Sequence, residues 1–133
     1  MKLSLVLPAV AILVAASQCS AAPVVDAMYR TATEGILHIG HRTVVGGATD
    51  DWICFSEESP AAGSTWNIWY KGKSVWGPNR PAIGDFIADK SQDCRDKTSA
   101  PDVYNALLAG SGINTDLRLF VNGAFQPITR YSN

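Results

Sequence analysis

The 133-residue chain carries 11 Lys and Arg against 12 Asp and Glu, a formal net charge of −1, and 47% of its residues are hydrophobic. The near-neutral balance, with the two signs interspersed, argues against electrostatic capture of nucleic acid or of an anionic membrane surface. The length is that of one domain.

The first residues, "MKLSLVLPAVAILVAASQCSAAP", have the pattern of a secretory signal peptide. A single charge at Lys2 precedes an apolar run through Ala16, and small residues follow. The apolar run is too short to span a bilayer comfortably. We therefore predict a signal peptide over residues 1–21, cleaved after Ala21, and a secreted protein without a membrane segment.

Residues 22–50 are interpreted as an N-terminal extension, in which residues 36–45 could form a strand and the rest could be mobile or helical. After cleavage the chain keeps two cysteines, Cys54 and Cys94. In an oxidising compartment two cysteines allow one internal disulfide. Closing a loop of ~40 residues would stabilise the fold by about 4 kcal/mol. Two free thiols, or disulfide-linked dimers, are the alternatives.

From residue 51 onward the chain divides into short β-prone runs separated by turn residues. This pattern predicts a small all-β sandwich or barrel over residues 51–133. The expected strands number six: Asp51–Glu58, Ser64–Gly72, Lys73–Gly77, Ala82–Lys90, Leu117–Gly123 and Ala124–Arg130.

Residues 64–72 alternate Trp66 and Ile68 on one face with Trp69 on the other. Large apolar groups on both faces favour a strand between two packed layers. The alternative is that Trp69 belongs to an exposed aromatic platform.

One segment departs from the β pattern and predicts a short amphipathic helix over about residues 99–110. Ser99 stands three residues before Asp102, the spacing of a capping box. Pro101 lies in the first turn, and Gly110 provides a stop signal.

The last two runs are separated by Asn122-Gly123, the dipeptide that most strongly predicts a two-residue β-hairpin. Pro127 lacks the N–H that a sheet ladder needs, so the last strand is expected at a sheet edge.

No catalytic or metal-binding motif stands out, and we expect neither a cofactor nor a metal. The histidines, His38 and His41, lack the HExxH pattern of zinc proteases. A small ribonuclease would need one of them to converge with Glu57 or Glu58 and an arginine such as Arg80. This secreted hydrolase is one alternative function.

The candidate partner-binding residues lie around the turn between the second and third predicted strands. They are two lysines and two tryptophans, namely Trp69, Lys71, Lys73 and Trp76. Lysines beside aromatic rings could bind an acidic partner and, less convincingly, sugars or single-stranded nucleic acid. A carbohydrate-binding or antimicrobial module with Trp69 and Trp76 as its platform is a second alternative.

The order of these elements resembles the MAX effectors, small secreted avirulence and toxin-like proteins of plant-pathogenic fungi. Cys54 lies in the first core run, Cys94 follows the fourth, and "LRLFVNGAFQPI" supplies the last two. The resemblance covers residues 51–130 and implies a six-stranded antiparallel sandwich whose disulfide joins the first strand to the segment before the fifth. The predicted helix and residues 22–50 are additions to that pattern.

The resemblance also implies a non-enzymatic effector that binds a host plant protein, partly by strand-edge contact, and that an immune receptor can recognise. A monomer that binds neither nucleic acid nor membrane is expected. Action outside host cells and action after translocation into them both stay open.

Overall fold

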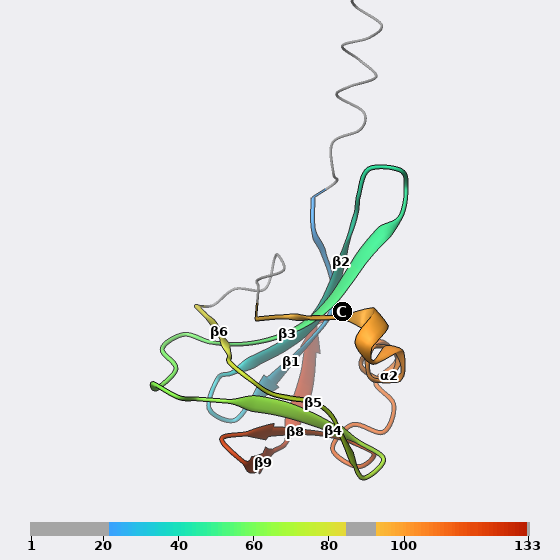
Figure 1. The fold of residues 1–133 in the computed structure, drawn as a ribbon. Coiled ribbons are helices and arrows are strands. Elements are labelled where there is room, and N and C mark those ends of the chain that lie inside the picture. The colour runs from blue at the N-terminus through green and yellow to red at the C-terminus, as the bar shows by residue number, and fades with distance from the viewer. Residues whose placement is uncertain (1–21, 85–92, 133) are drawn as a thin grey trace, which may run out of the picture.

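A computed structural model of the chain describes residues 22–84 and 93–132 (Figure 1). These residues form two β-sheets and one short α-helix, and a disulfide joins Cys54 to Cys94. The predicted all-β class, the inserted helix and the internal disulfide are therefore confirmed. The predicted signal peptide lies outside the described residues, as does most of the predicted strand Ala82–Lys90.

The first sheet has six strands in the order β10-β1-β2-β3-β6, and β7 also pairs with β3. All pairings are antiparallel except the short parallel one between β3 and β6. The strands of this sheet are β1 (Val24–Thr31), β2 (Ile36–Thr43), β3 (Thr49–Glu57), β6 (Ala82–Ile83), β7 (Arg95–Asp96) and β10 (Ile128–Ser132).

The second sheet has four antiparallel strands in the order β5-β4-β8-β9. Its strands are β4 (Trp66–Tyr70), β5 (Lys73–Asn79), β8 (Leu117–Val121) and β9 (Ala124–Gln126).

Both hairpins of this sheet turn through two residues with positive φ. Asn122 and Gly123 have φ of 52° and 78°, and Lys71 and Gly72 have φ of 51° and 80°. Two positive φ values in a two-residue loop define the type I′ turn, which asparagine and glycine favour. The hairpin predicted from Asn122-Gly123 is confirmed.

The strand count and the role of residues 22–50 differ from the expectation. The described residues contain ten strands rather than six. Residues 22–50 are not an extension outside the sandwich, because they provide β1, β2 and the start of β3. Moreover, β1 and β2 lie inside the six-stranded sheet, paired on both sides.

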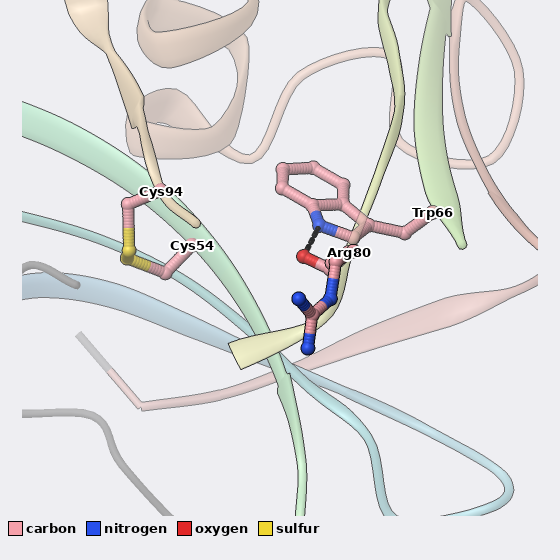
Figure 2. The surroundings of a disulfide bond; sticks show 4 residues. All are labelled: Cys54, Trp66, Arg80 and Cys94. Atoms are coloured by element: carbon pink, nitrogen blue, oxygen red, sulfur yellow. Dashed lines mark hydrogen bonds between the residues drawn. A yellow bond between two sulfur atoms is a disulfide. The ribbon is translucent and has the colours of Figure 1, made fainter. Parts of the chain in front are cut away.

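One hydrophobic core lies between the two sheets and the helix. Trp66 of β4 is at its centre, fully buried, with its ring 6.0 Å from Phe55 of β3 and 6.4 Å from Trp76 of β5. The Trp66 indole N–H donates a hydrogen bond to the Arg80 carbonyl, at 2.9 Å (Figure 2). Because its polar atom is paired, this large side chain is buried without an unsatisfied donor.

The disulfide lies on the other side of β3 from this core. Side chains alternate along a strand, so Trp52 and Cys54 point away from Ile53 and Phe55. Trp52, Cys54 and Cys94 form a separate buried cluster. The disulfide therefore anchors the segment that begins at residue 93 to the middle of β3 (Figure 2).

The helix, α2 (Pro101–Ala109), follows a single 3-10 turn, η1 (Lys97–Ser99). Gly110, the predicted stop signal, is its C-terminal cap and has the left-handed conformation. The predicted capping box is wrong, because Ala100 occupies the N-cap and no side chain caps the helix there.

Two side chains of the six-stranded sheet hold the C-terminal end of α2. The Tyr29 hydroxyl donates to the Leu107 carbonyl at 2.6 Å, and Arg130 Nη1 donates to the Leu108 carbonyl at 3.0 Å. Carbonyls in the last turn of a helix have no partner within the helix, so these two bonds satisfy them.

Pro127 marks the point where the chain passes from one sheet to the other. The single strand expected over residues 124–130 is divided there into β9 and β10. Each of the two strands lies at an edge of its sheet, which agrees with the edge position expected from proline.

Removing the disulfide should destabilise the fold. The double variant Cys54→Ala/Cys94→Ala opens a loop whose ends are 40 residues apart in sequence, and we expect its free energy of unfolding to fall by about 2–5 kcal/mol. Denaturant unfolding monitored by tryptophan fluorescence measures the change. Addition of a reductant should lower the stability of the wild type and leave that of the variant unchanged. A wild-type curve that does not respond to reductant would contradict the prediction.

Candidate binding surface

The outer face of the four-stranded sheet carries the candidate site. In β4, Trp66 and Ile68 are buried in the core, whereas Trp69 is 37% exposed. In β8, Leu117 and Leu119 are buried, and Arg118 and Phe120, which alternate with them, point outward. The expectation that Trp69 is enclosed between two packed layers is therefore wrong, and the alternative, an exposed aromatic side chain, holds.

Three aromatic side chains meet on this face, one from each of three adjacent strands. Trp69 of β4 lies 5.8 Å from Phe120 of β8, and Phe120 lies 6.0 Å from Phe125 of β9, measured between ring centroids. Phe120 is half-buried between the other two, and Phe125 is 39% exposed. We call Trp69, Phe120 and Phe125 the aromatic patch.

A hollow of about 750 Å³ adjoins the aromatic patch and the turn between β4 and β5. We call it the hairpin groove. Its lining combines aromatic, cationic and small residues: Trp69, Lys71, Gly72, Thr115, Asp116, Arg118 and Phe120.

Hydrogen bonds to backbone carbonyls fix the backbone of Lys71 and the side chain of Arg118, the two cationic residues of the groove. The Lys71 N–H donates to the Asp116 carbonyl at 2.8 Å, which joins the β4–β5 turn to the segment before β8. Arg118 Nε donates to the Thr115 carbonyl at 3.1 Å, and its guanidinium lies 5.5 Å from the Phe125 ring centroid. The guanidinium is thus directed along the aromatic patch.

The two cationic side chains of the groove are not paired with carboxylates of the described residues. In the part of the chain that the structure describes, neither Lys71 nor Arg118 forms an ion pair. Asp116 is the acidic residue of the lining, and its carboxylate lies beside Gly112, where an added Cβ would be 3.5 Å from Asp116 Oδ2. The lining therefore has a formal charge of +1.

The four predicted partner-binding residues do not all share this surface. Trp69 and Lys71 line the hairpin groove. Lys73 is exposed directly after the turn but does not line the groove. Trp76 is buried against Trp66 in the core, so its assignment to a binding platform is wrong.

The sequence prediction missed three residues of this surface: Arg118, Phe120 and Phe125. The signal was present in the closing hairpin, because the Asn122-Gly123 turn pairs Val121 with Ala124 and therefore Phe120 with Phe125.

Comparison of the chain with protein-family models, with curated proteins and with solved structures gives no match. The assignment of a function therefore depends on the surface itself.

The histidines are not arranged for catalysis with Glu57, the glutamate at the end of β3. His38 is fully buried, and neither of its ring nitrogens has a hydrogen-bond partner among the described residues. His41 pairs with Asp51, six residues before Glu57 on β3, so His41 and Glu57 lie roughly 20 Å apart along the strand. The ribonuclease arrangement of a histidine, a glutamate and an arginine is therefore not assembled in the described residues.

His41 takes part in a structural contact instead. Its Nδ1 lies 2.8 Å from Asp26 Oδ2, and the Tyr104 hydroxyl donates to the same oxygen at 2.7 Å. The pKa of Tyr104 is raised by burial, by the hydrogen bond to Asp26, and by the charges of Asp26 and Asp51. Tyr104 thus remains a hydroxyl donor that joins α2 to β1.

A second, polar hollow of about 340 Å³ lies at the end of β3, where Glu57 and Glu58 both contribute to its lining, with Arg30 and Glu34. Glu57 is the last residue of β3 and Glu58 follows it outside the strand, so strand alternation does not separate the two carboxylates.

Neither a metal site nor a membrane helix is found within residues 22–84 and 93–132. No three His, Cys, Asp or Glu side chains gather there as metal ligands would. No helix in those ranges is long and apolar enough to cross a membrane.

The burial of His38 should make stability depend on pH. Burial lowers the pKa of His38 to about 4, below its ordinary value of 6.5. Between these two values the unfolded chain binds a proton at this histidine and the folded chain does not. Stability should therefore fall as the pH decreases from 6.5 to 4, with a slope from this group of up to about 1.4 kcal/mol per pH unit.

The measurement is denaturant unfolding across this pH range for the wild type and for His38→Leu. Both proteins contain His41, so the difference between their slopes reports on His38 alone. The variant should lose the His38 contribution to the slope. Equal slopes for the two proteins would contradict a neutral, buried His38.

Proposed function

We propose that this protein is a secreted effector that binds a host plant protein through the aromatic patch and the hairpin groove. Secretion is supported by the signal-peptide pattern of residues 1–21 and is compatible with the disulfide between Cys54 and Cys94. In this proposal the protein acts as a monomer, without catalytic activity, and an immune receptor can recognise it.

One observation carries the proposal, namely the three contiguous aromatic side chains on an uncovered sheet face. Tryptophan, phenylalanine and arginine are enriched in the centres of protein interfaces, where they supply most of the binding energy. The patch has this composition, with Arg118 beside Phe125. An exposed cluster of large apolar groups on a small secreted domain is otherwise unfavourable.

The face of the sheet is better suited to binding than its edges. The edge strand β5 contains Pro78, which lacks an N–H for pairing, and the other edge strand, β9, has only three residues. Addition of a partner strand needs a continuous row of free backbone groups. Within the four-stranded sheet we therefore place the contact on the face, whereas the family resemblance suggested a strand edge.

A carbohydrate platform is less well supported by the same geometry. Sugars stack on ring faces, and an extended polysaccharide needs several faces in one plane. Adjacent rings of the patch are tilted by 53° and 54°, and Trp76, the second indole of that hypothesis, is buried.

The proposal predicts that Trp69→Ala strongly reduces recovery of the partner. Native co-precipitation from plant tissue with tagged wild-type protein should yield a specific plant protein. Truncating a central interface aromatic costs about 2 kcal/mol or more, so recovery should fall by roughly 30-fold or more.

Tyr131→Ala is the matched control, because Tyr131 is 41% exposed but lies on β10 of the other sheet. Its recovery should equal that of the wild type, and circular dichroism should show that both variants fold. Failure of the wild type to retain any specific plant protein would count against the function. Equal recovery with Trp69→Ala would remove the patch from it.

A further inference from the structure

We propose that the hairpin groove recognises an acidic segment of the partner protein, in which an apolar side chain packs against Trp69 and Phe120 and flanking carboxylates pair with Lys71 and Arg118. This inference rests on the proposed function as a protein-binding effector and adds the chemistry of the ligand.

Arg118 is prepared to bind a carboxylate. Its Nε is used by the Thr115 carbonyl, which fixes the orientation of the guanidinium. Its two terminal nitrogens have no partner within the described residues. A guanidinium with two free terminal N–H groups can bind a carboxylate in a bidentate manner, and such pairs are stronger than neutral hydrogen bonds.

Lys71 supplies a second positive charge at the tip of the β4–β5 turn. Its backbone is fixed by the type I′ turn and by the bond to Asp116 O, while its Nζ is free of ion pairs in the described residues and lies 5.5 Å from the Tyr70 ring centroid. Lys73, exposed just after the turn, adds positive charge nearby. The groove thus combines apolar surface and unpaired positive charge.

Charge also distinguishes an acidic peptide from a polynucleotide. A single-stranded nucleic acid needs a continuous cationic track and parallel ring faces on which successive bases stack. Here Asp116 places a carboxylate within the groove, the formal charge of the chain is −1, and adjacent rings are tilted by more than 50°. The groove suits a few carboxylates beside an apolar side chain and not a row of phosphates.

The test uses the tryptophan fluorescence of the intact protein. Of the four tryptophans, Trp52, Trp66 and Trp76 are at most 5% exposed, so a ligand in the groove changes the emission mainly through Trp69. The probe is the blocked synthetic peptide Glu-Glu-Phe-Glu-Glu. One comparison peptide replaces every Glu by Gln, and another replaces Phe by Gly.

The acidic peptide should bind, and its affinity should fall as salt is added, because salt screens exposed ion pairs. Each comparison peptide should bind about tenfold more weakly, since each loses one of the two kinds of contact.

Protein variants test the same contacts from the other side. Arg118→Gln and Lys71→Asn should each lower the affinity for the acidic peptide roughly threefold, and the double variant about tenfold. The affinity for the Gln peptide should not change. Asparagine is chosen at position 71 because it tolerates the positive φ of that turn. Arg30→Gln is the matched control, because Arg30 also lies over an aromatic ring, that of Tyr131, but on the other sheet. It should bind as the wild type does.

Three results would overturn the inference: equal binding of the acidic and Gln peptides, unchanged binding by the Arg118→Gln/Lys71→Asn variant, or tighter binding of oligo-dT or of an oligosaccharide than of the acidic peptide. Recovery of a plant protein through Trp69, combined with any of these, would leave the proposed function intact and reject only the acidic ligand. Selective binding of the acidic peptide without recovery of a plant protein would support the acidic ligand and reject the proposed function.

Discussion

The burial of Trp66 between the two sheets determines the orientation of much of the structure. Its ring packs against Phe55 of one sheet and Trp76 of its own, and its indole N–H is satisfied by Arg80 O. Once Trp66 points inward, the alternation of β4 directs Ile68 inward and Trp69 outward. The exposure of Trp69 is therefore a consequence of how the core is packed, not an independent feature of the surface.

The same constraint extends across β8 to β9. Leu117 and Leu119 complete the core, so Arg118 and Phe120 must point to the opposite face. A slip of one residue in the pairing would expose the leucines and bury a guanidinium, which is strongly unfavourable. The register that stabilises the core thus also assembles the aromatic patch and places Arg118 beside the hairpin groove.

How much of this the sequence predicts depends on whether a strand has one buried face or two. The Asn122-Gly123 hairpin and the two faces of β4 follow from turn chemistry and alternation. By contrast, Ile36 to Gly40 are buried without alternation, because β2 is covered on both faces and even His38 is enclosed. Periodicity cannot show that such a strand lies inside a sheet, so the sequence allows a strand over residues 36–45 but predicts residues 22–50 as an extension outside the sandwich. Trp76 was misplaced for another reason: the β4–β5 register shifts twice, and such irregularities leave no sequence signal.

The two outer faces of the sandwich differ in a way that bears on binding. On the six-stranded sheet, Cys54 and its cross-strand partner His38 share the outer face with Trp52, and all three are fully buried. The disulfide to Cys94 is part of what packs there. On the four-stranded sheet, Trp69 and Phe125 remain more than one-third exposed. One face is thus completed within the chain, and a partner that covered the aromatic patch would give the other face an equivalent apolar contact. Because the patch is positioned by the core on its reverse side, such a partner would bind a preformed surface and lose little free energy in ordering it.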